Sequence, residues 1–130
     1  MHTICYVSSA RSNITQDELT HLFDFTVENN TLMNITGILL YESGKFLQVL
    51  EGEESLLKKL FAKIEVDSRH SNIFVILNKK SMYNIFADYA SGFSIVKTKE
   101  ELASIESYLD QIEDAPNVKY IKGILEPFLL

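Results

Sequence analysis

Residues 35–52 read ITGILLYESGKFLQVLEG, and this stretch decides the fold. The β-branched and apolar run 35–41 predicts a strand, and residues 46–50 predict a second strand that returns alongside it. Gly44, in the turn between them, can take a positive φ, so the pair forms a hairpin. Because side chains alternate along a strand, Gln48 is a polar residue within a strand that is apolar on both faces.

The flanking sequence predicts a strand and a helix before the hairpin, and a helix and two strands after it. A strand at 3–8 precedes a helix that begins after Thr15, with Glu18 completing a capping box, and ends near Asn29–Asn30. After the hairpin, an apolar stripe predicts a helix that ends around Val66. The pattern then predicts a buried strand at 73–77, a polar break at 78–81, and a last strand at about 86–96 with Gly92 inside it.

The resulting order is β-α-β-β-α-β-β, which indicates an α+β, ferredoxin-like sheet with both helices on one face. Apolar residues at helical spacing predict two further helices, at 99–113 and 117–129, separated by Pro116. We expect this pair to cap the other face of the sheet. The expected organisation is a domain at 1–96 followed by a helical segment at 97–130.

Composition narrows the class of protein. A chain of 130 residues is about one domain, and a net charge of −6 disfavours direct binding of nucleic acid. The single cysteine, Cys5, excludes an intramolecular disulfide and fits a reducing compartment. The sequence contains neither a signal-peptide pattern nor an apolar run of membrane-spanning length. We therefore expect a cytoplasmic protein that does not bind membranes.

Common catalytic signatures are missing from the sequence. It contains no Gly-rich nucleotide loop, no Gly-x-Ser-x-Gly motif, and no paired spacing of its three histidines that would suit a metal. What remains is a set of polar residues inside strands or at helix ends. Each also has a plain structural explanation, such as a helix C-cap for an Asn or a local ion pair for Asp-x-Arg-His. The set comprises Tyr6, Asn29, Asn30, Gln48, Asp67, Arg69 and His70.

Taken in order, these pieces resemble the BLUF family, the blue-light sensors that use FAD. The similarity covers about residues 1–96. Its most specific parts are Phe46-Leu47-Gln48-Val49-Leu50-Glu51-Gly52 and Asp67-Ser68-Arg69-His70. Tyr6-Val7-Ser8, Asn30 and Ile35-Thr36-Gly37-Ile38-Leu39 support it in the same register.

The resemblance implies a role for each polar residue. The flavin ring would lie between the two helices, and Tyr6 would give it an electron and then a proton after light absorption. Gln48 would end rotated or tautomerised, with a new hydrogen bond to the flavin that shifts its absorption to the red. The other implied cofactor-binding residues are Leu22, Thr26, Asn29, Asn30, Lys63, Ile64, Asp67, Arg69 and His70.

The sequence departs from the family pattern near its last strand. Tyr89 stands where the family often has Trp, and Ser91 where it often has Met. The resemblance assigns these two positions to signal relay. A second redox-active tyrosine at 89 also raises the hypothesis that Tyr89 competes with Tyr6 as electron donor.

The leading interpretation is a short photosensor without enzymatic activity of its own, since about 34 residues follow the sensor. Its output would be an interaction with a downstream regulatory protein, and we expect a homo-oligomer. One alternative is a non-photoactive ferredoxin-like module that binds another ligand or a partner. Another is an acylphosphatase-like enzyme, which Arg11 alone suggests, although the loop around it lacks glycine.

Overall fold

The computed structural model describes residues 1–81, 84–90, 92–112 and 118–129. It divides into two compact units, Met1–Ile95 and Val96–Leu130. The elements along the chain are β1 (His2–Ala10), α1 (Gln16–Leu32), β2 (Thr36–Glu42), β3 (Lys45–Gly52), α2 (Glu54–Glu65), β4 (His70–Lys80), β5 (Phe93–Val96), α3 (Lys99–Gln111) and α4 (Val118–Leu129).

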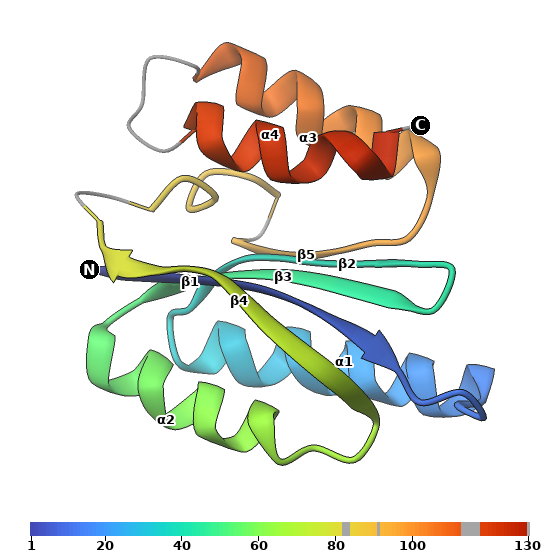
Figure 1. Ribbon diagram of the computed structural model, residues 1–130. Coiled ribbons are helices and arrows are strands. Elements are labelled where there is room, and N and C mark those ends of the chain that lie inside the picture. Colours follow the sequence, from blue (N-terminus) through green and yellow to red (C-terminus); the bar gives the residue numbers. More distant parts are fainter. Residues whose placement is uncertain (82–83, 91, 113–117, 130) are drawn as a thin grey trace. The chain divides into compact units, whose positions relative to one another are not determined.

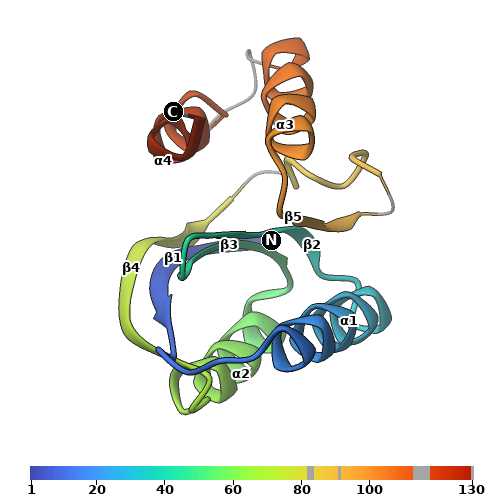
Figure 2. The same ribbon diagram turned by 90° about the vertical axis from the view of Figure 1, so that its right-hand side faces the viewer.

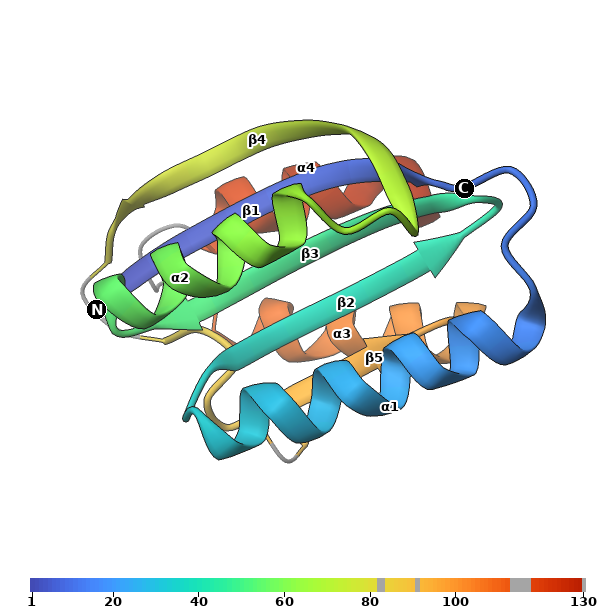
Figure 3. The ribbon, with the colours of Figure 1, turned by 90° about the horizontal axis from the view of Figure 1, so that it is seen from below.

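The strands form one sheet in the order β4-β1-β3-β2-β5. Helices α1 and α2 lie side by side on the same face of this sheet, as the views in Figures 1, 2 and 3 agree. The predicted ferredoxin-like arrangement is therefore confirmed. It follows from two β-α units whose helices must both bury an apolar stripe on one sheet face.

Helix α1 begins as predicted. The Thr15 hydroxyl accepts a hydrogen bond from the Glu18 backbone, and the Glu18 carboxylate accepts one from the Thr15 backbone. The helix ends at Leu32 with Met33 as its C-cap, slightly beyond the predicted end. Residues Asn29 and Asn30 are thus part of the last turn and not its cap.

The register of the three central strands places the polar residues of the sheet. In β1 and β3, Tyr6 pairs directly with Gln48, and in β2 Leu39 pairs with Gln48 on the other side. Directly opposed residues point to the same face of a sheet. These three side chains therefore form one row across the sheet, on the face that α1 and α2 cover.

Strand β4 differs from the prediction. It runs from His70 to Lys80, so the expected polar break at 78–81 was wrong over its first three residues. It is also not buried: Phe74 is 67% exposed and Val75 39% exposed. The physical reason is the position of β4 at the edge of the sheet, beside β1. A content of β-branched and aromatic residues predicts a strand, but it does not predict that the faces of the strand are buried.

The last strand is shorter than predicted. It begins at Phe93, so the expectation of a strand over about 86–96 was wrong for its first part. The backbone N–H groups of Ile85 and Phe86 donate to the Glu51 carboxylate, at 2.6 and 2.9 Å, in place of a neighbouring strand. Ala90 and Gly92 then take positive φ values, which interrupt extended structure.

The second unit contains the two predicted helices. Thr98 and Glu101 form a capping box at the start of α3, and Asp110 of α3 pairs with Lys122 of α4. Pro116 lies outside the described residues. Capping of the open sheet face by these helices remains a prediction. Within the described ranges, no helix has the length and apolar character needed to cross a membrane.

Candidate functional site

A pocket opens between α1 and α2 above the central row of the sheet. All eleven residues that the sequence predicted as cofactor-binding line it. Three come from strands, four from α1, two from α2, and two from the turn that leads into β4. They are Tyr6, Leu22, Thr26, Asn29, Asn30, Gln48, Lys63, Ile64, Asp67, Arg69 and His70.

Helical spacing explains how the two helices supply so many lining residues. In α1, Leu22, Thr26, Asn29 and Asn30 recur three or four positions apart, so they share one side of the helix. In α2, Lys63 and Ile64 follow Leu60 with the same spacing. Each helix thus presents one side to the core and an adjacent side to the pocket.

Four lining residues were missed by the sequence reasoning. Alternation on β3 placed Phe46 on the same face as Gln48, which was an available signal. Leu39 needed the β2–β3 register, and Leu60 sat in the general apolar stripe of α2. Phe25 was one of the apolar residues at helical spacing, which gave no sign of a pocket position, and the structure leaves it 56% exposed.

Tyr6 and Gln48 meet at the floor of the pocket. The Tyr6 hydroxyl donates a hydrogen bond to Gln48 Oε1 at 2.5 Å, and both residues are almost fully buried. The Tyr6 ring also packs against Phe61 and His70, at centroid distances of 5.6 and 6.2 Å. A phenol and an amide held this closely form a donor–acceptor pair in which either partner can change its hydrogen bonds.

Burial raises the pKa of Tyr6 above its ordinary value, and negative charge on Asp67 adds to the effect. A raised tyrosine pKa gives stability that is present below the ordinary pKa of about 10 and is lost as the pH rises beyond it. We expect the free energy of unfolding, measured with urea, to fall between about pH 9.5 and 10.5. Tyr6→Phe should have a smaller decrease over this range. An equal decrease in both proteins would contradict a raised pKa for Tyr6.

Asn30 carries an unsatisfied donor. The residue is 1% exposed, and its side-chain Nδ2 has no hydrogen-bond partner within the part of the chain that the structure describes. Leaving a buried amide donor unpaired costs about 1–3 kcal/mol. The neighbouring Asn29 differs, since its amide donates to Met33 Sδ at 3.6 Å. The pocket therefore has an amide donor suited to the carbonyl oxygen of a bound ligand.

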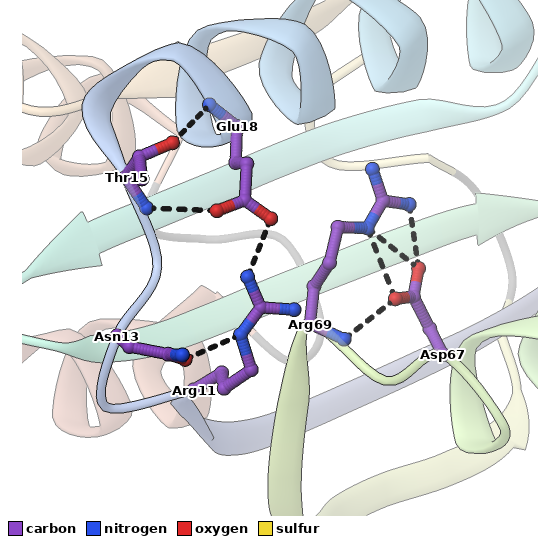
Figure 4. Close-up of polar contacts among 6 residues, drawn as sticks. All are labelled: Arg11, Asn13, Thr15, Glu18, Asp67 and Arg69. Carbon is purple, nitrogen blue, oxygen red and sulfur yellow. Dashed lines mark hydrogen bonds and ion pairs between the residues drawn. The ribbon is translucent and has the colours of Figure 1, made fainter.

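Figure 4 shows the charged residues Asp67 and Arg69, which line the pocket, paired with each other. Arg69 donates to both carboxylate oxygens of Asp67, with a closest contact of 2.6 Å, and this pairing holds the pKa of Asp67 below its usual range. Outside the pocket lining, Arg11 pairs with Glu18, and its backbone N–H donates to the Arg69 carbonyl at 2.8 Å. Lys63 is exposed at the pocket edge.

His70 is held at both ring nitrogens. The Ile64 carbonyl lies 2.7 Å from Nε2 and, as a carbonyl, can only accept, so Nε2 carries the hydrogen. In the neutral ring Nδ1 then accepts from the Ser8 hydroxyl at 2.8 Å. These two contacts tie the start of β4 to β1 and to the end of α2, and so they shape the charged end of the pocket.

The two positions predicted for signal relay are not part of the pocket lining. Tyr89 is half-buried in the segment of turns before β5, where its carbonyl accepts from Gly92 N–H at 2.9 Å. Ser91 lies outside the described residues. A relay role for either position, and competition of Tyr89 as electron donor, remain predictions.

Comparison with known proteins identifies the class to which this fold and pocket belong. The family model "Sensors of blue-light using FAD", BLUF, matches residues 1–92, and the chain belongs to this family. BLUF domains bind FAD.

Several individual proteins that are similar to this chain are also described as light-responsive or as BLUF proteins. BlrB, described as a BLUF protein in its dark state, superposes with a TM-score of 0.70 at 27% identity, covering 85% of this chain and 82% of that one. The "Photoactivated adenylate cyclase subunit alpha-like protein FB" of Euglena gracilis is 37% identical over 77% of this chain. The "Blue light- and temperature-regulated antirepressor BluF" of Escherichia coli K12 is 28% identical over 93% of it. The matches span only 10% and 27% of these two relatives.

Proposed function

We propose that this protein is a blue-light receptor that holds FAD in the pocket between α1 and α2 and signals through a protein–protein interaction. The observation that carries the proposal is the buried Tyr6–Gln48 hydrogen bond at the floor of that pocket. Membership of the BLUF family supports FAD as the cofactor.

The lining residues fit the chemistry of a flavin nucleotide. The unpaired amide of Asn30 would donate to a carbonyl of the flavin ring, with Asn29 and Thr26 beside it. Leu22 and Ile64 would cover the two faces of the ring. The cations Lys63 and Arg69 would compensate the phosphates, because charge-assisted hydrogen bonds to anions are the stronger kind. Asp67 and His70 would orient Arg69 and close the same end.

Tyr6 and Gln48 would perform the photochemistry. When bound and excited by blue light, FAD supplies an electron acceptor. Tyr6 gives up an electron, and its hydroxyl proton leaves along the hydrogen bond to Gln48 Oε1. The electron and the proton both return to Tyr6, so Tyr6 is chemically unchanged at the end. The Gln48 amide is left with a different set of hydrogen-bond donors and acceptors. In a dry pocket, such an exchange changes the local electrostatics more than it would in water.

The direct test is spectroscopic. The purified protein should bind FAD and turn yellow, and blue light should shift the flavin absorption reversibly to the red. A protein that takes up no FAD would overturn the proposal and favour the alternative of a non-photoactive ligand- or partner-binding module. Bound flavin with an unchanged spectrum under light would also contradict the photoreceptor function.

Asn30→Leu should weaken flavin binding by about ten-fold, since the variant loses one hydrogen bond to a ring carbonyl. The flavin-free protein should be at least as stable as before, because its unpaired amide is removed. Asn29→Leu should weaken binding less, as the Asn29 amide already has a partner in Met33. Flavin titration monitored by fluorescence measures both affinities. Equal losses at the two positions would contradict this role for Asn30.

The protein that receives the light signal is part of the same proposal. BluF is named a blue light- and temperature-regulated antirepressor, which supports a regulatory protein as the receiver of the signal. We propose a downstream regulatory protein as partner and a homo-oligomeric state, with α3 and α4 carrying the signal. Size-exclusion chromatography with light scattering, in darkness and under blue light, tests the oligomeric state.

A further inference from the structure

Glu51 is a fully buried carboxylate that lies outside the pocket. It is 0% exposed and comes from β3, three residues after Gln48 and on the opposite face of the strand. Among the described residues, no lysine, arginine or histidine forms an ion pair with it. Burying an ionisable group without a counter-charge costs free energy unless several hydrogen-bond donors satisfy it. The groups that donate to Glu51 are therefore important for its place in the fold.

Three donors from two other segments satisfy Glu51. The Thr36 hydroxyl of β2 donates to Oε1 at 2.9 Å, and the Phe86 backbone N–H donates to the same oxygen at 2.9 Å. The Ile85 backbone N–H donates to Oε2 at 2.6 Å. Burial raises the pKa of Glu51, while the two backbone donors act against that shift. The carboxylate therefore joins β2, β3 and residues 85–86.

A second tie fixes the far end of the same segment. The Gly37 N–H of β2 donates to the Gly92 carbonyl at 2.9 Å. The next residue, Phe93, is 2% exposed and packs in the core cluster that contains Tyr6 and Leu39. Glu51 thus holds the beginning of a segment whose end is part of the core around the Tyr6–Gln48 pair.

We propose that Glu51 is a positioning residue of the photocycle, which holds residues 85–86 against the strand that carries Gln48 and thereby slows the return to the dark state. This inference rests on the proposed photoreceptor function. A close-packed interior resists the rotation of a buried side chain. Weakening the hydrogen bonds from residues 85–86 to Glu51 lets the segment that ends at Phe93 move more. Gln48 then returns more easily to the hydrogen bond with Tyr6 that it has in the dark state.

The test compares two Glu→Gln variants of the full chain loaded with FAD. In Glu51→Gln one carboxylate oxygen becomes an NH2 group, which can only donate. The single remaining oxygen cannot accept from both backbone N–H groups and the Thr36 hydroxyl together. We expect the red shift to persist and the dark recovery to become about five-fold faster, as for the loss of one hydrogen bond. Amide hydrogen exchange at Ile85 and Phe86 should accelerate. Glu53→Gln, at an exposed position two residues away, should recover at the wild-type rate.

A second pair of variants leaves the carboxylate in place. Thr36→Val removes the hydroxyl donor at nearly constant volume, and Thr36→Ser keeps it. We expect faster recovery in Thr36→Val and recovery near the wild-type rate in Thr36→Ser. Wild-type recovery rates in both Glu51→Gln and Thr36→Val would overturn the positioning role, even if amide exchange increases. The absence of any red shift in the wild-type protein would instead show that the proposed function has failed.

Discussion

Replacing Tyr6 by Phe will abolish the light-induced red shift while the flavin stays bound. The substitution removes only the hydroxyl, so the ring can still pack against Phe61 and His70. The variant loses the proton that is donated to Gln48 Oε1 at 2.5 Å, and a phenyl ring is a far poorer electron donor than a phenol. The measurement is the difference spectrum before and after blue light, at matched flavin occupancy.

Tyr41→Phe is the matched control. Tyr41 packs against Phe23 and Phe46 but is not among the residues that line the pocket. Its variant should keep the full red shift. The variant Gln48→Leu should lose the shift as Tyr6→Phe does, since it removes the other half of the pair. A red shift of wild-type size in Tyr6→Phe would remove Tyr6 from the photochemistry.

Gly37→Ala will have the largest effect on stability. Gly37 has φ +141°, and a Cβ atom built there would lie 1.9 Å from the Val49 carbonyl oxygen of the neighbouring strand. The backbone fixes the position of the Cβ atom, and the oxygen belongs to the backbone, so a side-chain rotation cannot relieve the clash. A substitution of this kind costs about 3 kcal/mol or more in the free energy of unfolding.

The measurement is urea or thermal unfolding of the two proteins side by side. A loss of about 3 kcal/mol corresponds to a melting temperature lower by roughly 10 °C for a chain of this size. Gly123→Ala in α4 is the control, because a Cβ there meets nothing within 4 Å. It should stabilise the protein by about 0.5–1 kcal/mol, as expected inside a helix. A Gly37→Ala protein as stable as the wild type would contradict the close strand approach.

The consequence of Gly37→Ala extends to the pocket. Gly37 is two residues before Leu39, which pairs with Gln48, and its backbone also ties down Gly92. If β2 is displaced from β3, the row Tyr6–Gln48–Leu39 loses its support on one side. We therefore expect weaker flavin binding in any Gly37→Ala protein that folds.

Local signals determined most of the element order from the sequence. The Thr15–Glu18 capping box, the turn with Gly44 and the periodicity of α2 depend only on residues near one another in the chain. Gln48 stood out because a polar residue interrupts an apolar strand. These features need no tertiary contact to be recognised, which is why the fold order could be predicted.

Tertiary structure alone decided what those elements meet. Strand β4 looked buried, yet it lies at the sheet edge with Phe74 exposed. In the expected last strand, the Phe86 backbone N–H donates to the Glu51 carboxylate, and the strand itself begins only at Phe93. Neither fact has a local signal, since both depend on which segment far along the chain lies beside the residue.

The same division holds for the site. The sequence by itself determined which polar residue types this protein carries and, through the resemblance, which role each would have. Only the strand register placed the Tyr6 hydroxyl against Gln48, and only the packing of α1 left Asn30 with an unpaired donor. The reason is physical: a hydrogen bond depends on distance and direction between groups, and those are set when the sheet and helices pack together.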